Sequence, residues 1–160
     1  MKNDKTQKII FSICYWFLSL TWGIIGTIIG ILAVIGTLIF GGAIHKNGCS
    51  FIVEIGGNWG GLNLGPIALC GHYSKNSIGF YEHVRRHEFG HGIQHCVLGI
   101  LFPLIIGIPS AIRYWYQRIR ESKGLINKPY DSIWFEGSAT KIGTATIDWY
   151  ESHKNIQEKE

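Results

Sequence analysis

The longest apolar stretch of the chain runs from Ile9 to Ile44 and contains no charged residue. One bilayer-spanning helix needs about 20 such residues, whereas a cleavable secretory signal has an apolar core of about 7 to 15. The stretch therefore predicts a retained membrane anchor over residues 1–45. A helix buried in the core of a soluble domain is the alternative interpretation.

A single helix over this stretch would be about 54 Å long, which is more than the apolar core of a bilayer requires. The most polar point inside it is Thr21-Trp22-Gly23. A break there predicts a short apolar helix followed by a transmembrane helix over Ile24–Ile44. One long tilted helix and a tight two-helix hairpin are the alternatives. Gly26 and Gly30 form a G-x-x-x-G pattern that permits close helix contact, although packing within the chain explains it equally well.

Two β-rich runs follow the anchor and are separated by a cluster of glycines. Phe51–Ile55 is the first run, residues 56–61 form the glycine-rich turn, and Leu62–Cys70 is the second run. The pattern predicts a small β-hairpin, and Pro66 favours an edge position for its second strand. An exposed edge strand can bind an extended peptide as one further strand.

A second apolar run, Cys96–Ile112, is short for a transmembrane helix. Pro103, Gly107 and Pro109 interrupt it. We therefore expect a re-entrant or membrane-surface element that returns to the side from which it came. The segment Arg113–Tyr116 follows as a basic and aromatic belt of the kind found at membrane interfaces.

Charge also favours a position at a membrane. The net charge is +4 with histidines counted as neutral, and basic residues flank the two apolar stretches: Lys2, Lys5, Lys8, Arg113, Arg118, Arg120 and Lys123. Cytoplasmic segments next to a membrane typically carry such residues, so a lipid bilayer is an expected partner. The chain has no run of five or six basic residues, and its 11 acidic residues nearly balance its 15 basic ones. This pattern argues against a nucleic-acid partner.

The four cysteines are Cys14, Cys49, Cys70 and Cys96. They form no C-x-x-C motif, so a thiolate metal site or a thioredoxin-type motif has no support. Cys14 lies in the first apolar stretch and is expected to behave as a small hydrophobic residue. Cys49 and Cys70 flank the predicted hairpin and would be able to form a disulfide in an oxidising compartment, while a fully reduced chain is the equally supported alternative.

The strongest chemical signal is the pentapeptide His87–His91, which reads H-E-x-x-H. On a helix, residues four apart differ by about 400° of rotation, so His87 and His91 point in nearly the same direction. Two imidazoles placed in this way can bind zinc. Glu88 lies about 100° further round, where a general base for a metal-bound water is needed.

The helix that carries this motif is expected to begin near Phe80 or Tyr81. It presents a histidine at every fourth position: His83, His87, His91 and His95. Because a catalytic zinc site takes three protein ligands and leaves one position open, the four histidines cannot all bind one ion. We expect His83 and His95 to form a polar face that lines the site or contacts water.

The third ligand has to come from elsewhere in the chain. A longer H-E-x-x-H-x-x-G-x-x-H motif would need glycine and histidine where the chain has Gln94 and Val97. A glutamate from a later helix is the other common solution. Five glutamates follow the motif: Glu121, Glu136, Glu151, Glu158 and Glu160. Glu136 is favoured because it lies in Trp134–Thr140, among small residues that permit close helix contact; a glutamate stabilised in a first helical turn is the alternative.

The order H-E-x-x-H followed by E-x-x-A resembles the gluzincins, the zinc metallopeptidases whose third ligand is a glutamate. His87–Gln94 and Trp134–Gly143 are also similar to segments of small, uncharacterised bacterial membrane proteins, a resemblance that covers about residues 55–145. The resemblance implies zinc held by His87, His91 and Glu136, with Glu88 as the base. Many gluzincins have an aspartate after the alanine to orient a ligand histidine, and Thr140 stands there instead.

These features predict an α+β membrane protein with an N-terminal transmembrane helix or hairpin, a small β-hairpin, and zincin-like helices over residues 46–160. His87, His91 and Glu136 can share one ion only if the segment 96–112 does not cross the membrane. The predicted function is a zinc metallopeptidase of the bacterial cytoplasmic membrane that hydrolyses peptide or protein substrates near the bilayer surface. Candidate oxyanion donors are His72, His95, Tyr130 and His153. A non-catalytic membrane interaction protein, with a structural zinc or no metal, is the alternative.

Overall fold

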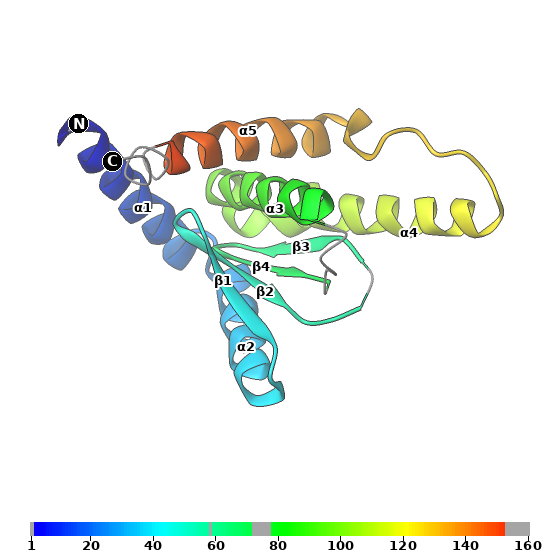
Figure 1. Cartoon of the computed structure of the whole chain (residues 1–160), viewed down its shortest axis with the longest axis horizontal. Helices are drawn as coiled ribbons and strands as arrows, with labels where there is room; N and C mark the ends of the chain where they lie inside the picture. The colour runs from blue at the N-terminus through cyan, green and yellow to red at the C-terminus, as the bar shows by residue number, and fades with distance from the viewer. Residues whose placement is uncertain (1, 58, 72–77, 153–160) are drawn as a thin grey trace.

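The computed structural model describes residues 2–57, 59–71 and 78–152, and these residues form an α+β fold (Figure 1). The α+β prediction is therefore confirmed. The elements are α1 (Lys2–Thr21), α2 (Ile24–Phe40), β1 (Ala43–Asn47), β2 (Ser50–Glu54), β3 (Gly61–Leu64), β4 (Ile67–Cys70), α3 (Ile78–Leu98), η2 (Gly99–Leu101), η3 (Pro103–Gly107), α4 (Ile108–Ser122), η4 (Tyr130–Ser132) and α5 (Trp134–Glu151). Of the short elements, η2 and η4 are 3-10 turns and η3 is a π-helical turn.

The sheet has the strand order β1-β2-β4-β3 and lies between α2 and α3. Alternation along the strands sends neighbouring residues to opposite faces. Val53 and Leu69 therefore pack against α2, while Ile52 and Ala68 pack against α3. On its other side α3 packs against α5, so the layers run α2, sheet, α3 and α5.

The predicted hairpin is wrong in its strand pairing. Strand β2 pairs in parallel with β4 and antiparallel with β1. The second β-rich run folds on itself instead, as the antiparallel hairpin β3–β4. Its two-residue connection is Gly65-Pro66, where Gly65 has φ +75°. Glycine at positive φ followed by a proline is the combination that a type II′ turn accepts, so Pro66 lies in the turn and not in a strand.

The break predicted at Thr21–Gly23 is confirmed, and one long N-terminal helix is excluded. Helix α1 ends at Thr21, α2 begins at Ile24, and the two are bent by 98°. Within the described part of the chain, no single helix is both long and apolar enough to cross a membrane. Two pairs of helical segments, each pair bent at a short break, together have the length and apolar composition of a membrane span. They are Asp4–Thr21 with Ile24–Phe40, and Gly79–Leu101 with Pro103–Ser122.

The apolar segment after the H-E-x-x-H motif doubles back. It forms the end of α3, the turns η2 and η3, and the start of α4, and the second bent pair turns by 116°. Just before the break, Gly99 has φ +56°, a conformation that glycine adopts readily, and a side chain there would collide with the indole of Trp22. As a result, α5 lies beside α3.

The described cysteines are all free thiols. Cys49 and Cys70 are buried in different clusters: Cys49 lies with Tyr15 and Phe89, and Cys70 lies with Ile52 and Val84. The structure therefore corresponds to the reduced alternative.

Two glycines let α3 and α5 pack backbone against backbone. A Cβ atom at Gly90 would collide with the backbone of Ala139, and one at Gly143 would collide with the carbonyl of Arg86. Since these atoms belong to rigid helices, neither collision can be relieved by rotating a side chain.

We predict that Gly90→Ala lowers the free energy of unfolding by about 1–3 kcal/mol, because the added methyl group forces the two helices apart. The matched control is Gly36→Ala in α2, where a Cβ meets nothing within 4 Å. Alanine is the better helix former, so the control is expected to be as stable as the original chain or slightly more stable. Thermal unfolding followed by circular dichroism tests this, and equal melting temperatures for the two variants would contradict it.

Candidate metal centre

The three predicted metal ligands meet between α3 and α5. Glu136 Oε2 lies 3.1 Å from His87 Nε2 and 3.0 Å from His91 Nε2. All three residues are buried, and Glu136 is 0% exposed. Atoms that each lie about 2.1 Å from one ion in tetrahedral directions are about 3.4 Å apart. The arrangement can therefore bind one metal ion after only small movements of the side chains.

The other ring nitrogen of each histidine is held by an uncharged partner. His87 Nδ1 lies 2.8 Å from Thr140 Oγ1, and His91 Nδ1 lies 2.7 Å from Gln94 Oε1. The amide nitrogen of Gln94 donates to Phe135 O and to Ser138 Oγ, both at 2.8 Å. Because its donors are used, Gln94 can only present its oxygen to His91. His91 then carries a proton on Nδ1, and its Nε2 donates to Glu136 at 3.0 Å. When Nε2 gives up that proton, its lone pair is placed to bind a metal.

Sequence reasoning left these supporting partners unassigned. Thr140, which stands where the resemblance to gluzincins would imply an aspartate, contacts His87 directly. In the sequence alone, Gln94 excludes the longer motif and shows no other role. Its spacing of three from His91 on one helix was the signal that could have identified it, since such residues are neighbours on a helix surface.

The electrostatics of the site fit a cation. Burial disfavours the charge on Glu136, but the hydrogen bonds from His87 and His91 outweigh it and hold the pKa of Glu136 below its usual range. Burial raises the pKa of Glu88, against the attraction of His91 and His87. Among the described residues, Glu136 Oε1 and Glu88 Oε2 are buried without a hydrogen-bond partner. Buried carboxylate oxygens of this kind are costly unless a positive charge compensates them.

Strand β3 forms a wall beside Glu88. A Cβ atom at Gly61 would lie 2.5 Å from Glu88 Cγ, so only glycine lets the carboxylate lie against this strand. Asn63 then ties the strand to the helix, because its Nδ2 donates to Glu88 O at 3.0 Å and to Gly65 O at 3.1 Å. The strand that follows the glycine cluster is thus fixed next to the predicted base.

A groove of about 550 Å³ runs past these residues between β3, α3 and the η3–α4 segment. His87, Glu88 and His91 lie in its wall. Much of the remaining lining is apolar, including Leu62, Phe80, Val84, Phe102, Ile106 and Trp115. A ligand in this groove would contact the metal centre on one side and apolar side chains on the others.

Tyr130 is the candidate oxyanion donor that the structure brings to the groove. Its ring lies 6.0 Å from that of His87, and its hydroxyl lies 3.0 Å from Ser110 Oγ. The guanidinium of Arg113 donates to Tyr130 O and to Ser132 Oγ and lies over the Tyr130 ring. Burial raises the pKa of Tyr130. The phenol therefore stays protonated and able to donate.

Of the other candidate donors, His95 alone lies in the described part of the chain, and it does not meet the metal ligands. His95 is 2% exposed and packs against Gly23, Gly26 and Phe102, so it supports the bend between α1 and α2. Burial lowers its pKa to about 4. The expectation that His95 lines the site is therefore wrong, whereas His83 is exposed and does line the groove. His72 and His153 lie outside the described residues.

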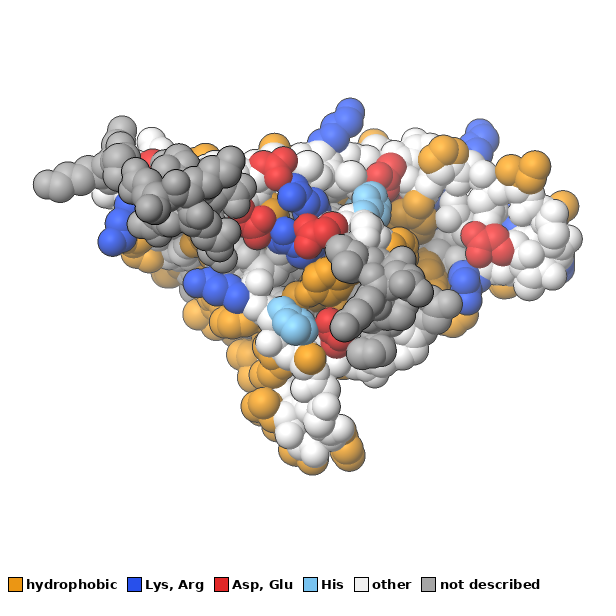
Figure 2. Space-filling model, viewed as in Figure 1, with side chains coloured by type: hydrophobic (Ala, Val, Ile, Leu, Met, Phe, Trp, Pro, Cys, Tyr) orange, Lys and Arg blue, Asp and Glu red, His pale blue; other side chains and the backbone are white. Residues whose placement is uncertain are grey.

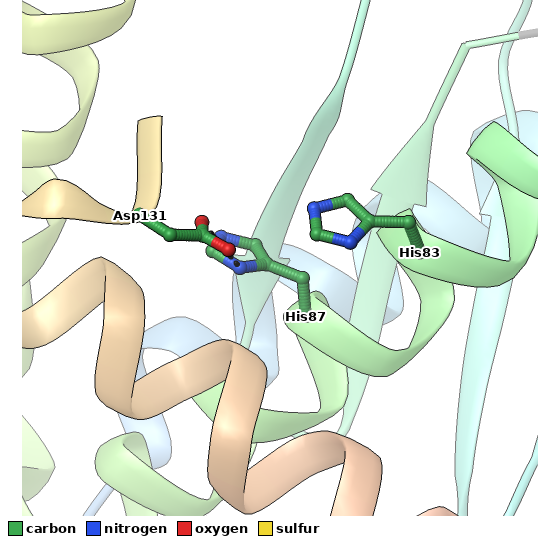
Figure 3. Close-up of side chains that lie close together, drawn as sticks. All are labelled: His83, His87 and Asp131. Carbon is green, nitrogen blue, oxygen red and sulfur yellow. Dashed lines mark ion pairs between the residues drawn. The ribbon is translucent and has the colours of Figure 1, made fainter. Parts of the chain in front are cut away.

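Figure 3 shows a second group of possible ligands that shares His87 with the first: His83 from the preceding turn of α3 and Asp131 from η4. Asp131 Oδ1 lies 4.0 Å from His87 Nδ1. That nitrogen already pairs with Thr140, and His83 is exposed. The buried group of His87, His91 and Glu136 is the better metal site, because both imidazoles are oriented and all three ligands are shielded from water.

We predict that Glu136→Gln abolishes metal binding, because a neutral amide replaces the only anionic ligand. Gln94→Leu should weaken metal affinity about 10- to 100-fold, because His91 loses the partner that fixes its tautomer. Metal content by mass spectrometry and competition with a chromogenic chelator measure both effects.

The matched control for Glu136→Gln is Glu121→Gln on α4, whose side chain is 54% exposed. It should bind metal like the original chain. Full metal content in Glu136→Gln would show that the site has been assigned wrongly.

No family model, no curated protein and no solved structure matches the chain. The site combines two oriented imidazoles with one buried carboxylate, and a second buried carboxylate lies beside them.

Proposed function

We propose that the chain is a zinc-dependent peptidase that hydrolyses peptide bonds in the groove between β3, α3 and α4. The observation that carries the proposal is the meeting of buried His87, His91 and Glu136, with Glu88 next to them in the groove wall. Two histidines and a glutamate are a common ligand set of catalytic zinc, which keeps its fourth position open. A purely structural zinc site is normally closed by four protein ligands, and no fourth ligand lies in this group among the described residues.

When bound, zinc would supply a Lewis acid that lowers the pKa of water and polarises the scissile carbonyl. The chain's own contribution begins with Glu88, whose buried carboxylate has an oxygen without a protein partner. Such a carboxylate can accept a proton from the attacking water and deliver it to the leaving amine. Its position against Gly61 fixes it between the ligands and the edge strand.

Tyr130 is proposed to stabilise the carbonyl oxygen as negative charge develops there. A donor preorganised in a buried site is effective because it does not have to reorient during the reaction. Ser110 holds the Tyr130 hydroxyl, and Arg113 holds the backbone of η4. These contacts come from α4 and would keep the phenol in place without adding a charge at the reacting atoms.

The proposed substrate is an extended peptide. Strand β3 is the last strand of the sheet within the described residues, so its outer edge is available to pair with a further strand. A peptide paired in this way would lie along the groove, with alternate side chains directed toward the apolar wall. The sequence predicted an edge strand in the second β-rich run, and the strand of that run that lies at the edge of the sheet is β3.

We predict that Glu88→Gln keeps about one zinc per chain but lowers peptide hydrolysis by about 10²- to 10⁴-fold, because general base catalysis is lost. Hydrolysis of a mixture of internally quenched peptides and the metal content of the same preparation measure the two effects. The matched control on the same helix is Glu82→Gln, whose side chain is 41% exposed and pairs with Arg85. Hydrolysis that survives unchanged in Glu88→Gln would exclude this mechanism and favour the non-catalytic alternative.

Tyr130→Phe should keep the metal and lower kcat by about 10²- to 10³-fold with little change in KM, as the loss of a transition-state donor does. Tyr116→Phe on α4 is the control, because that side chain is 58% exposed. Steady-state kinetics on the best peptide of the mixture provide the comparison. A loss of metal in Tyr130→Phe, or an unchanged kcat, would show that Tyr130 does not act in this way.

A further inference from the structure

The outer faces of α1 and α2 expose a large apolar surface. Nine large apolar side chains of α2 are at least 41% exposed, among them Leu32, Leu38, Ile39 and Phe40 at 61–88%. Figure 2 shows hydrophobic side chains crowding the edge along α1 and α2, while charged side chains gather over α3 and α5. Contiguous apolar patches of this extent mark an interaction surface. We propose that the two bent helix pairs embed together in one leaflet of an anionic bilayer, so that the chain lies on the membrane without crossing it.

The position of the sheet determines how deep α2 can lie. The inner face of α2 packs on the sheet through Ala33 and Val34. The sheet is open, and its edge strand β1 carries the exposed side chains of His45 and Lys46. Unpaired backbone groups at an open sheet edge are not tolerated in hydrocarbon. Because α2 and the sheet are packed side by side, α2 cannot cross the bilayer core without taking this edge with it, and so it lies along the surface.

The second bent pair continues the same apolar surface. Trp22 Nε1 donates to Val97 O at 3.3 Å, and Gly99 packs against the Trp22 ring, so the two bends are in contact. Val97 is 73% exposed, and the exposed apolar side chains continue along η3 and α4 with Leu104 and Ile112. The exposed apolar side chains of both pairs therefore form one continuous surface, which a single occupant can cover.

Helix α4 has the character of a helix that lies in a membrane interface. Ile108, Ile112, Trp115 and Ile119 recur at helical spacing, and all are at least half exposed. Residues 113–128 carry five basic side chains and one acidic one. A helix with an apolar stripe, an interfacial tryptophan and a basic flank binds bilayers and favours anionic lipids. This charge balance selects a lipid surface over a second copy of the same basic chain.

The first test is binding of the full chain to vesicles of phosphatidylcholine with and without phosphatidylglycerol, measured by flotation. The chain should float with both and more completely with the anionic vesicles. Ile39→Glu and Ile112→Glu should each reduce partition by about tenfold or more. Ile142→Glu on α5 is the matched control, because Ile142 is 39% exposed and lies outside this surface. Circular dichroism confirms that each variant is folded.

The second test asks whether the chain crosses the bilayer. Lys5→Cys, Lys46→Cys and Lys123→Cys are introduced singly into a Cys14→Ser background, in which the remaining cysteines are buried. All three replaced positions are exposed. In sealed membrane vesicles of each orientation, a membrane-impermeant maleimide should label all three from the same side.

Labelling of any two of these positions from opposite sides would overturn the proposal in favour of a spanning anchor. Equal binding to neutral and anionic vesicles would exclude the role of the basic flank. Protein that stays off vesicles and sediments as a defined dimer in detergent-free buffer would show that a second copy covers the surface.

Discussion

The close backbone contact between α3 and α5 is the constraint on which the rest of the structure depends. The Glu136 carboxylate on α5 meets His87 and His91 on α3 where the two helices pack at a distance that glycine permits. Gly90 and Gly143 provide that contact without side chains between the backbones. The bend between Leu101 and Pro103 reverses the chain, so that α5 lies beside α3 and this contact can form.

The bent segment that returns α5 has a second consequence. Helix α4 leaves the body of the molecule next to the groove, and Ser110 and Arg113 on α4 hold the η4 turn that carries Tyr130. The outward stripe of the same helix is apolar, with Ile112 64% exposed. The helix that we propose to lie in the membrane interface is thus also the helix that positions a proposed catalytic donor.

Local sequence signals predicted the parts of this structure that depend on local chemistry. The polar break at Thr21–Gly23 and the helix with H-E-x-x-H are of this kind, and the small-residue surroundings of Glu136 identified a position that the fold does bring to the two histidines. Strand pairing was not predictable, because the parallel pairing of β2 with β4 depends on contacts far apart in the sequence. The prediction for His95 was wrong for a related reason. Helical spacing predicts that His95 points in nearly the same direction as His91, but the ring of His95 is enclosed by the α1–α2 bend, which is distant in the sequence.

The uncharged partners of the two histidines also bear on reactivity. In many gluzincins an aspartate orients a ligand histidine, whereas here Thr140 and Gln94 do so. A carboxylate partner raises the basicity of the imidazole and adds a negative charge next to the metal. With neutral partners, the ligand set contributes only the charge of Glu136, so a bound dication keeps a net positive charge. Among the described residues, Glu88 and Asp131 each have a buried carboxylate oxygen without a hydrogen-bond partner near this site. If a metal binds as proposed, the Glu88 carboxylate would help to balance its charge, and the proton affinity of the proposed base would then depend on the metal.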